Sequence, residues 1–186
     1  MRVRYNAPVI LTFTLLAFAV LAIDRLVGGF IQTWFVCPAK LEGPLDYLRL
    51  LSYVLGHKDW AHLMSNFAFV LLIGPVLEEK YHSGPMLLMM IITALATGVL
   101  NVLLFNTGLM GASGIVFMLI LLSSFTNIRA GDIPITFVLI VALFLAKEIL
   151  NALSEDDISQ FAHILGGFCG SLFGFLFTRA GRRERA

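Results

Sequence analysis

The feature that most constrains this chain is a long run without a charged side chain. From Tyr81 to Ile128 the sequence contains no Asp, Glu, Lys or Arg. This run is too long for one membrane-spanning helix, which needs about 20 mostly apolar residues. Asn106-Thr107-Gly108 offers a tight turn near its middle. The run therefore predicts two successive spanning helices joined by a short connection.

The composition of the whole chain agrees with a membrane location. Of its 186 residues, 59% are hydrophobic and only 13% are charged. A soluble domain carries about 25% charged residues and about 45–50% apolar ones. We therefore expect an all-α integral membrane protein, surrounded by the lipid bilayer, that forms one domain over residues 1–186. A net charge of +1 argues against a nucleic-acid partner.

Six segments have the length and composition of a spanning helix. The first is interpreted as an uncleaved span, because no small-residue cleavage site follows it before Asp24-Arg25. The segment Leu45–Leu55 is strongly apolar but too short to span, so we expect it to lie in the membrane interface. The six spans are expected at about residues 7–23, 60–77, 85–105, 109–126, 133–153 and 158–178.

The distribution of Lys and Arg predicts how the spans are oriented. Cytoplasmic loops of membrane proteins are enriched in these residues. We therefore expect a multi-pass protein of the cell membrane with both termini in the cytoplasm. This orientation places eight of the 13 basic residues on the cytoplasmic side, namely Arg2, Arg4, Lys80, Arg129, Arg179, Arg182, Arg183 and Arg185.

Polar residues lie near the outer ends of three spans that run in the same direction. His62 and Asn66 fall near the start of the second span, four residues apart and on one helix face. Ser113 falls near the start of the fourth, and His163 near the start of the sixth. Each is expected four to seven residues inside the helix, or about 6–10 Å below its outer end. Polar groups at bilayer depth are costly and often functional, so this common layer is a candidate site.

Small residues predict close contact between the fourth and sixth spans. The residues around the serine are Gly111, Ala112 and Gly114. The sixth span repeats a small residue at every fourth position, namely Ala162, Gly166, Gly170 and Gly174. Such stripes let helix backbones approach closely in membranes. We therefore expect Ser113 to lie within hydrogen-bonding reach of His163.

These residue types suit acyl transfer by a serine nucleophile. A serine hydroxyl needs a base to take its proton, and His163 has a suitable pKa range. No Asp or Glu is expected at the same depth, so a dyad is favoured over a triad. His62, Asn66 and the backbone N–H of Ser113 are the candidate donors to the oxyanion. Phe117, one turn beyond the serine, is expected to stack on the imidazole, and no metal or cofactor is required.

Each residue also has a purely structural explanation. A serine between small residues is most often a packing residue, and a lone intramembrane histidine is as often structural as functional. Asn66 could simply form a hydrogen bond across helices. His57 and His82 lie at span ends and are interpreted as solvated. Only the combination favours a catalytic site.

Taken together, the motifs resemble those of the rhomboid intramembrane serine proteases. They are His57-x4-His62-x3-Asn66, Gly111-Ala112-Ser113-Gly114 and Ala162-His163-x2-Gly166-x3-Gly170, in this order on alternate spans. The resemblance implies a six-helix core with a Ser113–His163 dyad. It also implies an oxyanion site formed by His62, Asn66 and backbone N–H groups. The expected substrates are single-span membrane proteins, cut in or near their transmembrane segment, with no metal or organic cofactor.

Two positions depart from the family pattern, and two other functions stay open. Arg49 fits the arginine of the family's first-loop Trp-Arg motif, but Leu48 stands where tryptophan is usual. Phe117 takes the place of a frequent tyrosine. The alternatives are a catalytically inactive rhomboid-like protein that binds transmembrane clients and a small transporter. A zinc protease is disfavoured because no His-Glu-x-x-His occurs. The sequence predicts neither the natural substrate nor the oligomeric state.

Overall fold

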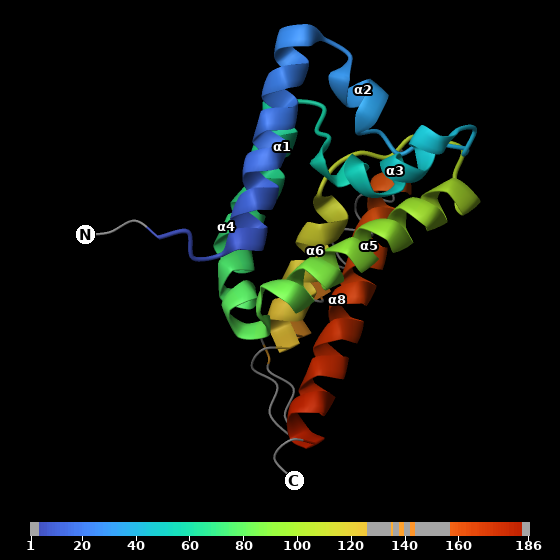
Figure 1. Cartoon of the computed structure of the whole chain (residues 1–186). Coiled ribbons are helices and arrows are strands. Elements are labelled where there is room, and N and C mark those ends of the chain that lie inside the picture. The colour runs from blue at the N-terminus through green and yellow to red at the C-terminus, as the bar shows by residue number, and fades with distance from the viewer. Residues whose placement is uncertain (1–3, 126–134, 136–137, 140–141, 144–156, 184–186) are drawn as a thin grey trace.

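A computed structural model describes residues 4–125, 135, 138–139, 142–143 and 157–183 (Figure 1). The fifth expected span, 133–153, therefore falls almost wholly outside the described residues. The described part is helical, and its one β-type pairing is an isolated bridge between Cys37 and Leu109. In chain order the helices are α1 (Pro8–Val27), α2 (Phe30–Trp34), α3 (Pro44–Ser52), the 3₁₀ turn η1 (Tyr53–Leu55), α4 (Trp60–Tyr81), α5 (Ser83–Leu104), α6 (Ser113–Ser124) and α8 (Asp157–Arg183).

Three of the described helices are long and apolar enough to cross a membrane. They are α1, α4 and α5, and they match the first three expected spans in place and order. Two shorter apolar stretches, Ser113–Ser124 and Phe161–Leu176, match the fourth and sixth. The chain is thus an all-α membrane protein, and the total of six spans stays a prediction.

The helices α1 and α4 lie side by side (Figure 1). Phe13 of α1 and Phe67 of α4 have ring centroids 5.2 Å apart. At the other end of the pair, the buried carboxylate of Glu78 accepts hydrogen bonds from the backbone N–H groups of Val9 and Ile10, both at 3.0 Å. These N–H groups belong to the first turn of α1 and have no partner within the helix. Glu78 therefore fixes the start of α1 against α4.

The first loop folds as helices α2 and α3 followed by η1, and Arg49 holds them together. Its guanidinium donates to the backbone carbonyl of Thr33 at 2.8 Å and to the Asp46 carboxylate at 2.9 Å. Asp46 also accepts from the N–H groups of Glu42 and Gly43, and these bonds hold the pKa of its carboxyl below the usual range. The arginine expected from the sequence thus anchors the loop.

The segment Leu45–Leu55 has one buried and one exposed face, as expected for a helix in the membrane interface. Leu50 and Tyr53 are buried, whereas Tyr47 and Leu48 are about 65% exposed. Leu48, which replaces the expected tryptophan, therefore does not pack into the protein core. The depth of this segment in a bilayer stays a prediction.

The start of the fourth span differs from the sequence prediction. The helix was expected from about residue 109, but α6 begins at Ser113. Leu109 instead exchanges two backbone hydrogen bonds with Cys37, at 2.8 and 3.0 Å. Gly111 then adopts a φ of 115°, which is incompatible with a right-handed helix. Pairing with the first loop therefore competes successfully with helix formation over residues 109–112.

The helices α6 and α8 contact each other through glycine, as the small-residue stripe predicted. A Cβ atom at Gly166 would overlap the backbone carbonyl of Gly114, and one at Gly170 would overlap that of Met118. The two helices run side by side (Figure 1). Because glycine has no side chain, the backbones come closer than any other residue would permit.

Candidate active site

The α6–α8 contact brings the neighbours of Ser113 and His163 together. Gly114 follows Ser113, and its Cβ position lies 3.3 Å from the carbonyl oxygen of Ala162, which precedes His163. Ser113 is half-buried and is the first residue of α6. The two sequence-distant residues proposed as nucleophile and base therefore each adjoin a residue of the contact between two closely packed helices.

The imidazole of His163 is held by an aromatic ring. His163 is buried, and its ring centroid lies 4.3 Å from that of Phe117, with 39° between the ring planes. The two rings expected to stack are in contact, with their planes tilted rather than parallel. A Ser113–His163 hydrogen bond is not among the described contacts. Such bonds are often long before a substrate binds and shorten in the reactive complex.

His62 lies on the other side of the serine, against Gly111. A Cβ atom at Gly111 would lie 2.8 Å from Cε1 and 2.9 Å from Nε2 of the His62 ring. Glycine is therefore needed here both for its positive φ and for the space that the imidazole occupies. The ring thus lies against Gly111, two residues before the serine, and its buried Nδ1 atom has no hydrogen bond among the described residues.

The expected common depth of these residues is only partly correct. His62 is the third residue of α4, and Ser113 is the first residue of α6, so neither lies four to seven residues inside its helix. His163 does, since α8 begins at Asp157. The site is therefore located at two helix N-termini. The Asp59 carboxylate caps the first turn of α4 by accepting from the His62 N–H at 2.7 Å, whereas α6 has no side-chain cap and presents its first N–H groups to the site.

The interpretation of His57 as a solvated residue is wrong. Its side chain is completely buried, and its ring packs against those of His62 and Phe67 with centroids 4.9 and 5.6 Å away. The turn before α4 folds inward here because Gly56 lies against the backbone of Phe35, where a Cβ atom would overlap. The sequence offered one indication that His57 belongs to the site, because it shares a motif with His62. Its position at the end of a predicted span favoured a solvated residue instead.

His57 organises the hydrogen bonds of the site. Its Nδ1 lies 3.2 Å from the carbonyl oxygen of Leu55, which can only accept, so we assign the ring proton to Nδ1. Its Nε2 is then the acceptor for the side-chain amide of Asn66 at 3.1 Å and the backbone N–H of Ala112 at 3.4 Å. This arrangement requires a neutral imidazole. Burial first, and then the positive charge on neighbouring His62, lower the pKa of His57 from 6.5 to about 4.

These hydrogen bonds determine which donors remain for a reacting group. His57 uses the N–H of Ala112 and one of the two N–H bonds of the Asn66 amide. The second amide N–H of Asn66, the ring of His62 and the backbone N–H of Ser113 are the remaining candidates. Asn66 is buried, and its Nδ2 atom lies 3.8 Å from the Cβ position of Gly111. A carbonyl oxygen between Ser113 and this group would meet preorganised donors.

Comparisons with known proteins identify the family of the chain. The chain is similar to Rhomboid protease GlpG of Haemophilus influenzae, with 22% identity over 145 residues and 76% of each chain covered. It is also similar to Rhomboid protease GlpG of Yersinia enterocolitica, at 25% identity over 92% of this chain and 63% of that protein. Rhomboid-related protein 2 of Mus musculus is 29% identical over 75% of this chain and half of its own length. The family model of the Rhomboid domain matches residues 44–180, so the chain belongs to the rhomboid family.

Proposed function

We propose that the protein is an intramembrane serine endopeptidase that uses Ser113 as nucleophile and His163 as base. The observation that carries the proposal is the glycine contact between α6 and α8, with Gly166 against the Gly114 carbonyl. This contact leaves Ser113 and His163 on two closely packed helices, and the Phe117 ring lies against the imidazole. Membership of the rhomboid family and the names of the similar proteins support the same chemistry.

The reaction follows from the positions of these groups. The Ser113 hydroxyl attacks the scissile carbonyl carbon while His163 takes its proton. The oxyanion that forms accepts hydrogen bonds from His62, Asn66 and the Ser113 backbone N–H. His163 then returns the proton to the departing amine, and water hydrolyses the acyl-serine by the reverse sequence of transfers. The proposed unit is a dyad, in which the Phe117 ring beside the imidazole helps to hold it in place.

The proposal also covers the class of substrate and the orientation of the protein in the membrane. Single-span membrane proteins are the proposed substrates, cut in or near their transmembrane segment, where the peptide can reach a site between spans. The active layer opens to the outside, both termini are cytoplasmic, and one six-span domain carries the site. The excess of basic residues on the cytoplasmic side supports this orientation.

A fluorophosphonate probe tests the proposal, because it reacts covalently with an activated serine. Purified protein should be labelled at Ser113, and Ser113→Ala should lose both the label and cleavage of a model single-span substrate. Ser124→Ala is the matched control, since it removes a hydroxyl from the same helix, where it donates to the Ile120 carbonyl one turn earlier. Labelling that survives in Ser113→Ala would contradict the assignment. Client binding without labelling or cleavage in the wild type would indicate an inactive rhomboid-like protein.

A further inference from the structure

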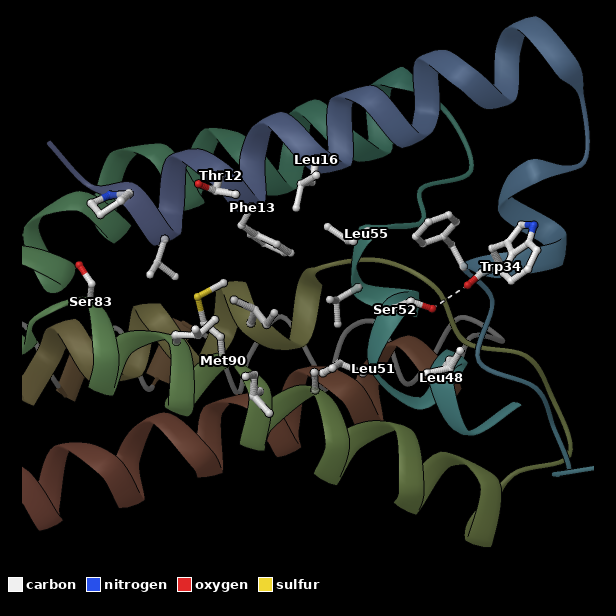
Figure 2. Close-up of a pocket in the computed structure, with 18 of the residues that line it drawn as sticks. Thr12, Phe13, Leu16, Trp34, Leu48, Leu51, Ser52, Leu55, Ser83 and Met90 are labelled. Atoms are coloured by element: carbon white, nitrogen blue, oxygen red, sulfur yellow. Dashed lines mark hydrogen bonds between the residues drawn. The ribbon is translucent and has the colours of Figure 1, made fainter. Parts of the chain in front are cut away.

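A large cavity lies between α1 and α5, next to the candidate active site but not part of it (Figure 2). Its volume is about 970 Å³, and α3 and η1 close it on the side of the first loop. Figure 2 shows Trp34 and Ser52 at one end and Ser83 toward the other, with Phe13 and Leu55 between them. Neither Ser113 nor His163 lines it.

The walls of this cavity offer a ligand almost nothing polar. They consist mainly of aliphatic and aromatic side chains, and the hydroxyls among them are those of Thr12, Ser52 and Ser83. Each hydroxyl already has a partner within the protein. Thr12 lies 2.9 Å from the Tyr5 hydroxyl, Ser52 donates to the Trp34 carbonyl at 2.6 Å, and Ser83 donates to the Glu78 carboxylate at 2.7 Å. Water needs two to four polar partners, so it gains little here. The ligand that fits is a hydrocarbon.

The cavity is continuous with the surface that lipid must cover. Leu16 of α1 and Leu87 of α5 line it and are 49% and 47% exposed. Their neighbours Leu15 and Leu88 are more exposed still, at 60% and 57%, on the outer faces of the same helices. Because both helices have the length and hydropathy of membrane spans, bilayer lipid is the solvent at this opening.

The dimensions agree with an acyl chain rather than with a peptide helix. Along α1 the lining extends from Pro8 to Leu16, a rise of about 12 Å at 1.5 Å per residue. The hydrocarbon depth of one leaflet is about 15 Å, half of the ~30 Å core. A helix about 10 Å across would fill the whole volume within roughly 12 Å of its length, whereas it needs ~30 Å to span.

We propose that this cavity is a binding site for an acyl chain of a bilayer phospholipid. The acyl chain supplies dispersion contacts to the side chains that line the cavity, and it fills the space between α1 and α5 beneath the first loop. This site is independent of the proposed proteolytic activity.

A phosphatidylcholine with a photoreactive diazirine in one acyl chain tests the proposal in phosphatidylcholine vesicles. Met90 and Phe13 line the cavity but are only 5% and 8% exposed, so bulk lipid around the helices does not reach them. We expect light to label both, together with the exposed Leu88 as an internal reference for bulk lipid. Labelled positions would be assigned by mass spectrometry of peptides.

Variants that fill the cavity give the matched comparison. Ile91→Trp places an indole in the cavity, whereas Ile92→Trp places it on the lipid-facing side of the same helix. Labelling of Met90 and Phe13 should be lost in the first variant and retained in the second. Ala94→Leu is a milder filling variant and should give the same loss if Ile91→Trp does not fold.

Three results would overturn the proposal. In the first, the wild type is labelled at Leu88 but not at Met90 or Phe13, so that lipid remains on the outer surface. In the second, the filling and control variants are labelled equally at the two buried residues. In the third, addition of a single-span substrate removes the labelling of Met90 and Phe13 while Leu88 stays labelled, which would assign the cavity to a protein segment.

Discussion

The buried imidazole of His57 should make the stability of the protein depend on pH in a defined window. Its pKa is lowered from 6.5 to about 4 in the folded state, because burial and the charge of His62 disfavour the cation. Between these values the unfolded chain binds a proton that the folded chain excludes. The contribution of the neutral ring is therefore fully present above about pH 6.5 and is lost as pH falls toward 4.

The size of this effect follows from the shift. A difference of roughly 2.5 pKa units corresponds to on the order of 3 kcal/mol at 1.36 kcal/mol per unit. His57→Phe keeps a ring but removes the titrating nitrogens. It also leaves the buried partners on Leu55, Asn66 and Ala112 unpaired, which should cost about 1–3 kcal/mol each.

The assay is reversible unfolding of both proteins in mixed detergent micelles between pH 7.5 and 4. The wild type should be the more stable protein at pH 7.5, and its advantage over His57→Phe should shrink by on the order of 3 kcal/mol by pH 4. Val54→Ala is the control, because it removes a buried apolar group from the same region and changes no titrating group. Its difference from wild type should stay constant. A constant difference for His57→Phe as well would refute a neutral, hydrogen-bonded ring at this position.

Three further predictions concern residues on α4 and α8. Glu78→Ala should lower the unfolding free energy by about 2–5 kcal/mol, because two buried N–H groups of α1 lose their acceptor, whereas the exposed Glu79→Ala should change it little. Gly166→Ala should reduce both thermal stability and fluorophosphonate labelling, since the new Cβ overlaps the Gly114 carbonyl, and Gly84→Ala, whose Cβ meets nothing within 4 Å, should retain both. Asn66→Ala should slow substrate cleavage by about 10²–10³ through the loss of one oxyanion donor, with fluorophosphonate labelling retained. An unchanged rate in a stable Asn66→Ala protein would remove Asn66 from the site.

The long helices could be predicted from the sequence because their signal is local. The spans expected at residues 60–77 and 85–105 correspond to α4 (Trp60–Tyr81) and α5 (Ser83–Leu104). A run of apolar residues bounded by polar ones sets both the existence and the length of such a helix. The small-residue stripe of α8 is equally local, and it correctly indicated which helix packs against it.

The start of α6 and the role of His57 could not be predicted in this way. Helix formation before Ser113 is prevented by pairing between Leu109 and Cys37, which are far apart in the sequence. The acceptor role of His57 depends on Ala112, 55 residues later. Apolar patterns carry no information about such long-range hydrogen bonds. For this reason the sequence identified the candidate site residues but not the histidine that organises their hydrogen bonds.

The most direct test of the central claim is the cleavage rate of a single-span substrate by four purified proteins. These are the wild type, Ser113→Ala, His163→Ala and the double variant, each checked for folding by its unfolding temperature. If the two residues act as a unit, the three variants should be equally inactive and the double variant no worse than either single one. Turnover that survives in folded Ser113→Ala, or losses that simply add in the double variant, would contradict a Ser113–His163 dyad.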